Sequence, residues 1–191
     1  MRRRRMLFPP LAPEFSMTLA QALENSPAPP DILANQTLLN IPFVDFEGQN
    51  QIGQLVLHRD LSSEVAELFR LLLVEGFPLG QMTPVAAFHW SDAASMEANN
   101  CSSFNYRVKV GKTELSAHAT GRGLDINPRQ NPYIRGDLVL PSHAIYSPHA
   151  PGTLTGNSLA VQFLEGRGWT WGGRWNTLKD YHHFEKPQGT A

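Results

Sequence analysis

The first clear pattern of apolar and polar positions lies just beyond residue 40. Residues 42–46 alternate between apolar and polar side chains, residues 47–50 are typical of a turn, and apolar residues return at 52–57. Side chains of a strand point alternately to its two faces, so alternation on both sides of a turn predicts a β-hairpin.

A helical period follows the hairpin. Five apolar residues recur at helical spacing: Leu61, Val65, Leu68, Phe69 and Leu72. They would share one face of a helix and face the core. We expect Asp60 to cap the N-terminus of this helix. We expect Gly76 to end it, because glycine readily adopts the left-handed conformation found at helix ends.

Shorter elements are predicted in the rest of the chain. We expect strands at residues 77–85, 103–108, 124–126 and 138–140, and helices at residues 92–98 and from 157 or 158 to 164. Residues 128–151 are rich in proline and glycine and are interpreted mainly as loop. Strands and helices mix without a βαβ rhythm, so the sequence predicts an α+β fold, with a small antiparallel sheet and flanking helices.

Prolines interrupt residues 1–40, which we expect to form a poorly ordered leader before an ordered domain at residues 41–187. Residues 1–6 resemble the charged head of a signal peptide, but residues 7–14 hold three prolines and an acid in place of its apolar centre. A basic tail, or a later start at Met6 or Met17, is the favoured interpretation. The localisation stays open between the cell envelope and the cytoplasm.

Composition narrows the class of protein. A chain of 191 residues with 41% hydrophobic and 17% charged residues is typical of one globular domain. Its net charge of −1 argues against a nucleic-acid binder, which normally carries a basic excess. Apolar runs are too short for a transmembrane segment. We expect the protein to act as a monomer.

Cys101 is the only cysteine, which excludes an intramolecular disulfide and a four-cysteine metal cluster. Its thiol, between Asn100 and Ser102, could act as a nucleophile. A small buried apolar residue is the favoured interpretation, because free cysteines are among the most buried residue types.

Candidate chemistry gathers first at residues 116–125. His118 and Asp125 are seven residues apart, which is too far for one helical face. They can converge if the chain turns at Gly121 and Gly123 and runs back as a strand, because glycine permits both the reversal and a close approach of the backbone. Zinc accepts imidazole nitrogen and carboxylate oxygen, so the pair suits a zinc site.

Residues 180–185 are the second candidate stretch and should supply a third ligand. Neighbouring residues of a strand point to opposite faces, so only one of His182 and His183 is expected to bind metal. Asp180, three residues before His183, could serve as general base toward the attacking water and then as acid to the leaving amine. The remaining histidines are interpreted as surface or hydrogen-bonded residues: His58, His89, His143 and His149.

These stretches carry a family resemblance. Residues 116–125 resemble the signature SxHxxGxAxD, and residues 180–184 the element DxxHF, of the D-alanyl-D-alanine carboxypeptidase family of zinc metallopeptidases, the VanY-like and L-alanyl-D-glutamate endopeptidase group. The likeness extends over residues 41–185 and includes the sequences at 105–107 and 168–173. Gly123 departs from the signature, where alanine is usual, and we expect this to cost rigidity rather than activity.

The resemblance implies a Zn²⁺ ion held by three ligands: His118, Asp125 and His183. Asp180 would be the catalytic base, Arg107 would polarise the substrate carbonyl and stabilise the oxyanion, and Ser116 would contact substrate or support the site. The implied fold is that of lysostaphin-type enzymes, D-Ala-D-Ala metallopeptidases and the hedgehog signalling domain.

The expected function is hydrolysis of a peptide bond in the peptidoglycan stem peptide, with D-alanyl-D-alanine carboxypeptidase activity as the first expectation. The alternatives are an L-alanyl-D-glutamate endopeptidase, as in endolysins, and a zinc-bearing binding module without turnover. A purely structural zinc would need a fourth ligand, and neither His182 nor Glu185 is well placed. Possible partners for a substrate carboxylate lie in the loop at 128–151: Arg129, Arg135 and His143.

Overall fold

The computed structural model describes residues 16–188 of the chain. Its N-terminal half is built on a long antiparallel hairpin of β1 (Gln36–Val44) and β2 (Asn50–His58). The turn between the strands is held by Asp45, whose carboxylate accepts hydrogen bonds from the backbone N–H groups of Glu47 and Gln49. The predicted hairpin is confirmed, and both strands are longer than the alternating pattern indicates.

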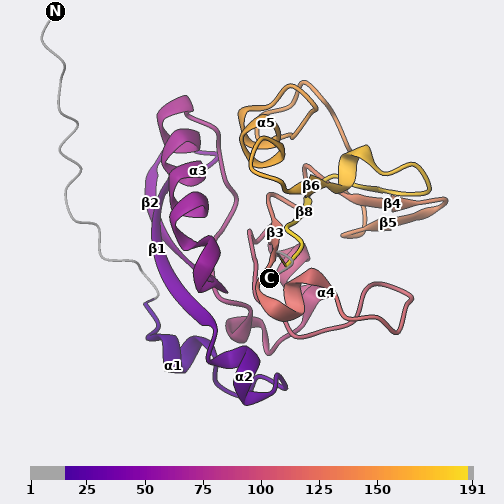
Figure 1. Cartoon of the computed structure of the whole chain (residues 1–191). Coiled ribbons are helices and arrows are strands. Elements are labelled where there is room, and N and C mark those ends of the chain that lie inside the picture. Colours follow the sequence, from indigo (N-terminus) through magenta and orange to yellow (C-terminus); the bar gives the residue numbers. More distant parts are fainter. Residues whose placement is uncertain (1–15, 189–191) are drawn as a thin grey trace, which may run out of the picture.

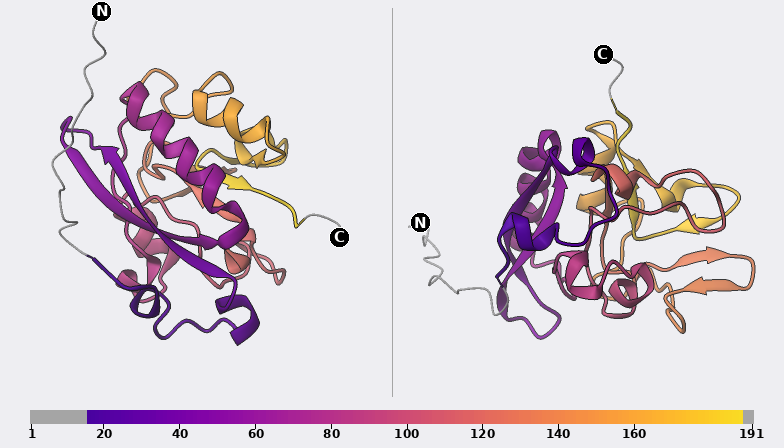
Figure 2. Two further views of the ribbon diagram at one scale, coloured as in Figure 1. Left: turned by 60° about the vertical axis from the view of Figure 1, so that its left-hand side comes forward. Right: turned by 90° about the horizontal axis from the view of Figure 1, so that it is seen from below.

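Helix α3 (Ser62–Glu75) lies across one face of this hairpin, and α5 (Leu159–Glu165) lies beside it (Figures 1 and 2). The five apolar residues of its predicted stripe are all buried in the main core. Gly76 ends the helix with a φ of 75°, as expected. Asp60 is not the cap, because residues 59–61 form a short 3₁₀ turn ahead of the helix.

Two three-stranded antiparallel sheets make up the C-terminal half. The first has the order β3 (Gly123–Asp125), β8 (His183–Glu185), β6 (Thr170–Trp171), and the second has the order β5 (Leu138–Leu140), β4 (Tyr133–Arg135), β7 (Lys179–Asp180). The fold is therefore mixed, with small antiparallel sheets and few helices. The strand predicted at residues 138–140 is confirmed.

The other short elements are α4 (Asp92–Glu97) and four 3₁₀ turns: η1 (Arg59–Leu61), η2 (Val85–Phe88), η3 (Ala117–Thr120) and η4 (Gly172–Arg174). The strands predicted at 77–85 and 103–108 are wrong. At 103–108 the backbone is shared among partners: Phe104 donates to Val56, Asn105 donates to His118, and Arg107 accepts from Ser116. No single neighbour runs alongside long enough to form a ladder.

Residues 16–40, which the sequence assigns to the leader, contain α1 (Leu19–Ala22), α2 (Pro30–Leu33) and the start of β1. Ala22 and Ala28 are buried in a small cluster with Val56 and Phe104. This part of the leader therefore packs on the domain. The signal-like stretch at residues 1–14 lies outside the described residues. Among the helices of residues 16–188, none combines the length and apolar character needed to span a membrane.

Candidate metal centre and active site

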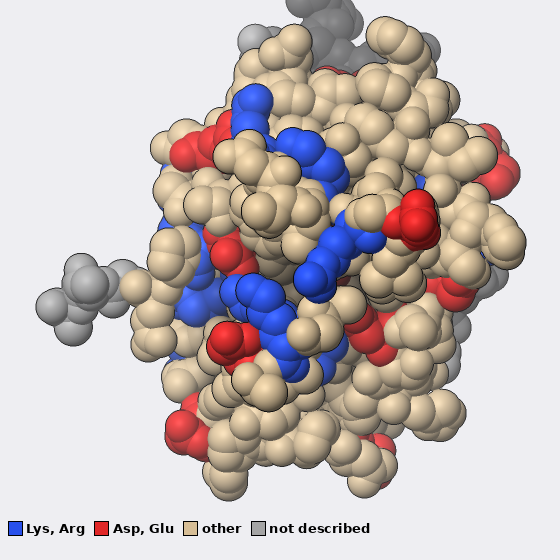
Figure 3. Space-filling model, turned by 90° about the vertical axis from the view of Figure 1, so that its right-hand side faces the viewer, with Lys and Arg blue, Asp and Glu red and all other residues tan. Residues whose placement is uncertain are grey.

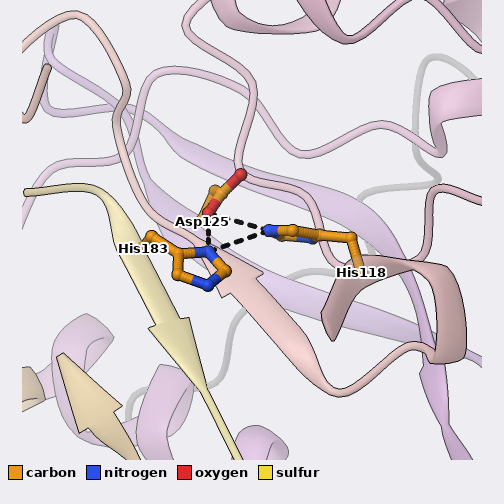
Figure 4. Close-up of side chains that lie close together, drawn as sticks. All are labelled: His118, Asp125 and His183. Carbon is orange, nitrogen blue, oxygen red and sulfur yellow. Dashed lines mark hydrogen bonds and ion pairs between the residues drawn. The ribbon is translucent and has the colours of Figure 1, made fainter. Parts of the chain in front are cut away.

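Three side chains, two from residues 118–125 and one from residue 183, converge at the paired strands β3 and β8 (Figure 4). Asp125 and His183 are directly opposite each other in the antiparallel register. Directly opposed residues of two strands project to the same face of the sheet. His118 reaches them from η3, which ends at Gly121 with a φ of 70°. The turn and returning strand expected between His118 and Asp125 are confirmed.

The donor atoms of this group face one another closely. His118 Nε2 lies 3.1 Å from Asp125 Oδ1 and 3.0 Å from His183 Nδ1, and the last two atoms are 3.0 Å apart. A tetrahedral zinc ion with bonds of about 2.0–2.1 Å holds its ligand atoms about 3.3 Å apart. Two imidazole nitrogens and one carboxylate oxygen at this spacing therefore fit a metal ion with a fourth position open.

Hydrogen bonds behind the ligands fix their orientation. His118 Nδ1 donates to the backbone carbonyl of Ser103, which leaves Nε2 as the atom that faces the centre. The hydroxyl of Ser116 accepts from the backbone N–H of His118 at 3.3 Å and so caps η3. His183 Nε2 lies 3.4 Å from the Glu185 carboxylate. Such outer contacts orient the ligands and set the tautomer of a metal-binding histidine.

Two glycines make room for this arrangement. A Cβ on Gly121 would lie 2.5 Å from the backbone nitrogen of His58 and in collision with Gln36. A Cβ on Gly123 would lie 2.9 Å from three atoms of the His118 ring. Gly123 therefore lies directly against a candidate ligand, a role that its departure from the signature did not indicate.

Charge is concentrated in the buried centre. Burial raises the pKa of Asp125, but His118 and His182 outweigh it and hold the pKa of this carboxyl well below its usual value of 3.8. Burial lowers the pKa of His183, yet contacts with Asp125 and Glu185 raise it to about 10. In the protein without metal, the carboxylate and the imidazolium therefore stabilise each other.

A cavity of about 320 Å³ opens beside the centre. Its lining includes Asp180, His183, Arg107 and Ser116. Its apolar wall is formed by Met96, Val110, Tyr133, Leu140, Trp175 and Leu178. His118 and Asp125 are 1% and 2% exposed and lie beneath this lining. The cavity and the two residues beneath it thus bring together the six site residues that the resemblance implies: Arg107, Ser116, His118, Asp125, Asp180 and His183.

Asp180 is held by a residue that sequence reasoning left out. His182 Nε2 lies 3.0 Å from Asp180 Oδ1, and His182 Nδ1 lies 2.7 Å from the carbonyl oxygen of Asn131. Burial lowers the pKa of His182, but Asp180 and Asp125 raise it to about 9. The only sequence signal for this residue was its place between the candidate base and a candidate ligand.

Arg107 faces the cavity while paired with an acid. Its Nε atom lies 2.9 Å from Asp92 Oδ1 at the start of α4. Its Nη1 atom donates to the carbonyl of Val108, and its own carbonyl accepts from the N–H of Ser116 at 3.0 Å. The backbone of Arg107 is thereby tied to the residue that caps the His118 turn.

The other reactive side chains lie elsewhere. Cys101 is completely buried, and burial raises the pKa of its thiol to about 12, so it is a core residue and not a nucleophile. Three histidines are exposed: His89, His143 and His149. His58 accepts a hydrogen bond from the backbone N–H of Asp60 at the start of η1. These histidines take no part in the centre.

Comparison with known proteins yields one match. Residues 110–186 match the family model described as D-alanyl-D-alanine carboxypeptidase. The matched segment contains the three converging residues together with Ser116 and Asp180, whereas Arg107 precedes it. Neither the curated proteins nor the solved structures contain a significant match.

Proposed function

We propose that this protein is a zinc metallopeptidase that hydrolyses a peptide bond of the peptidoglycan stem peptide, because residues 110–186 match the D-alanyl-D-alanine carboxypeptidase family model. The observation that carries the proposal is the convergence of His118, Asp125 and His183 beside a cavity that Asp180 and Arg107 also line.

The three converging residues would hold the zinc ion: His118 through Nε2, Asp125 through Oδ1 and His183 through Nδ1. A zinc ion at such a site polarises a carbonyl oxygen and lowers the pKa of water to near neutrality. The contacts from Ser103 to His118 and from Glu185 to His183 support this role, since they keep the donor atoms turned toward one point.

Asp180 would act as general base and then as general acid, taking a proton from the attacking water and passing it to the leaving amine. Its carboxylate lies at the cavity wall, close to the ligands. The contact with His182 holds Oδ1, so that the carboxylate has a fixed direction. Arg107 would stabilise negative charge on the substrate carbonyl oxygen, for which a fixed guanidinium is suited. Ser116 would support the site through its cap on the His118 turn.

We assign this activity to a catalytic domain at residues 41–187, with the lysostaphin-type and hedgehog-like zinc-peptidase fold as its architecture. Two short antiparallel strands that each supply a metal ligand support this assignment. Residues 16–40 pack against the domain through Ala22 and Ala28.

The family description favours removal of a terminal D-alanine, and cleavage between L-alanine and D-glutamate is the alternative. A zinc-bearing module without turnover is the third possibility. A binding module of this kind would not need a carboxylate and a guanidinium beside the metal ligands, whereas Asp180 and Arg107 line the same cavity as His183.

The proposal is tested with purified, zinc-loaded protein and a defined stem pentapeptide, with products identified by mass spectrometry. Loss of D-alanine supports the carboxypeptidase, and release of L-alanine supports the endopeptidase. The Asp180→Asn variant is the control and should retain zinc while losing turnover. An intact pentapeptide at full zinc occupancy would refute the proposed function.

A further inference from the structure

One edge of the cavity is formed by a tight hairpin at residues 108–115, here called the lysine hairpin. Val108 and Leu115 pair as an antiparallel bridge, and Lys109 N–H donates to the Glu114 carbonyl at 2.9 Å. The N–H of Lys112 donates to the carbonyl of Lys109 at 3.1 Å, which closes the turn. The two lysines are therefore carried by a defined loop next to the catalytic groups.

Both lysines line the cavity, together with Arg107. The face that carries this hairpin, β4 and β5 is hollowed, and Lys and Arg side chains border the hollow (Figure 3). Arg135 of β4 does not line the cavity, but it lies against the turn of the lysine hairpin. Its guanidinium lies within 3.7 Å of the position that a Cβ on Gly111 would take. The cavity lining therefore includes three basic side chains from one continuous segment, residues 107–112.

Three carboxylates also line the cavity, and each lies close to a basic side chain. Asp92 lies 2.9 Å from Arg107, and Asp180 lies 3.0 Å from His182. Glu185 lies 3.4 Å from His183 and 3.9 Å from Lys109. The ion pair between Lys109 and Glu185 is therefore long and leaves the ammonium group of Lys109 only weakly engaged.

Lys112 differs from these cations. Within residues 16–188, no carboxylate lies within ion-pair distance of its ammonium group. The lysine hairpin therefore presents two ammonium groups to the cavity: that of Lys109, 3.9 Å from Glu185, and that of Lys112, which has no ion-pair partner among residues 16–188. Such a site attracts an anionic group of whatever the cavity binds.

We propose that Lys109 and Lys112 form a subsite for a free carboxylate of the substrate, next to the bond that is cut. The subsite rests on the proposed peptidase function and specifies its substrate class: peptides with a carboxylate within a residue or two of the scissile bond. The stem peptide offers two such groups, the C-terminal carboxylate and the α-carboxylate of the γ-linked D-glutamate. Both present the same chemistry to the lysines.

The test uses four versions of one stem pentapeptide: unmodified, amidated at the C-terminus, amidated at the α-carboxylate of glutamate, and amidated at both. With the wild-type enzyme, amidation of the recognised carboxylate should raise KM about tenfold, the size of one charge-assisted contact. The amide that raises KM identifies the source of the carboxylate. Because the lysines are partly exposed, this preference should weaken at high salt.

The double variant Lys109→Gln/Lys112→Gln should cleave the acid and the amide with nearly equal KM and an unchanged kcat. The charge-matched control is Arg59→Gln/Arg70→Gln, which removes two exposed cations outside the cavity lining and should keep the wild-type preference. A wild-type enzyme indifferent to both amides, or a double variant that keeps its preference, would overturn the subsite and leave the peptidase intact.

A binding measurement on an inactive variant tests the carboxylate subsite independently of the peptidase activity. The zinc-loaded Asp180→Asn variant should bind the acid form about tenfold more tightly than the amide, as measured by calorimetry. Absence of both cleavage and binding for all four peptides would refute the proposed function and the subsite together. Binding without any preference between acid and amide would refute the subsite alone.

Discussion

The imidazole of His182 joins Asp180 to the protein interior, with its Nε2 atom 3.0 Å from Asp180 Oδ1 and its Nδ1 atom 2.7 Å from the Asn131 carbonyl. His182 is 4% exposed, and its Nε2 atom also lies 4.0 Å from Asp125 Oδ2. The ring thus stands between the proposed base and a proposed ligand, in close contact with the Asp180 carboxylate.

The first prediction concerns this contact. His182→Met keeps most of the buried volume and removes the polar link, so kcat should fall by about 10- to 100-fold, as for other partners behind a metal site. KM and zinc content should change little. Steady-state kinetics and metal analysis measure these quantities, with the exposed His89→Met as control. An unchanged kcat in a folded, zinc-loaded His182→Met variant would contradict the role of His182.

The second prediction concerns Gly123. In Gly123→Ala the new methyl would lie 2.9 Å from the His118 ring, so the imidazole must shift away from Asp125 and His183. We expect zinc affinity to fall by about tenfold, because ligand geometry is displaced while every donor remains. Competition with a chromogenic chelator measures this. Gly48→Ala is the control for loss of a glycine, since a Cβ there has no atom within 4 Å, although Gly48, unlike Gly123, has a positive φ of 76°. Equal zinc affinity in Gly123→Ala and wild type would show that the ring can adjust.

The third prediction is a pH dependence of stability that zinc reverses. In the metal-free protein the pKa of His183 is raised from 6.5 to about 10, so its contribution is complete below pH 6.5 and is lost as the pH rises toward about 10. The pKa of Asp125 is lowered, so its contribution is present above its usual value of 3.8 and is lost in acid. The stability of the metal-free protein should therefore be greatest between pH 3.8 and pH 6.5, where both contributions are present.

Zinc binding requires neutral imidazole, so it displaces the proton of His183, and the stabilisation by zinc should grow with pH over the range in which metal-free stability declines. Denaturant unfolding near pH 6 and near pH 9, with zinc and with a chelator, measures both trends. A metal-free stability that rises across this interval would be incompatible with the buried ion pair.

More of the candidate site than of the surrounding fold could be predicted from the sequence. His118 and Asp125 were recognisable because Gly121 lies between them and a strand follows, which are local features. Their pairing with His183 depends on β3 and β8 lying side by side, although 58 residues separate Asp125 from His183. The residue types at 180–185 indicated a third ligand there, and the family resemblance identified it as His183, but no local pattern indicated that β3 and β8 pair.

Other features were not local enough to be read from sequence. Residues 103–108 have a strand-like pattern, but their backbone hydrogen bonds go to β2, to His118 and to Ser116. His182 gave no periodic or spacing signal, and its role comes from Asn131 in another loop. The lysine hairpin likewise acquires significance only from its position at the cavity. The sequence offered three carboxylate partners, Arg129, Arg135 and His143, and none of them lines the cavity.

The fourth prediction concerns Asn131, which holds the loop behind the centre. Its side-chain amide donates to the carbonyls of Ile126, Asn127 and Gly152, and its Oδ1 accepts from the N–H of Leu154 at 2.7 Å. Asn131 is completely buried, so Asn131→Ala leaves several buried backbone groups without a partner. We expect a loss of about 2–4 kcal/mol in the free energy of unfolding.

Denaturant unfolding of the metal-free protein measures this loss, with Asn35→Ala as control because the Asn35 amide makes one exposed hydrogen bond. Asn131→Ala should also lower kcat, because the carbonyl of Asn131 anchors His182 and, through it, Asp180. The two effects are separable, since His182→Met should lower kcat without an equal loss of stability. A fully stable Asn131→Ala protein with wild-type kcat would show that His182 and Asp180 are positioned independently of this loop.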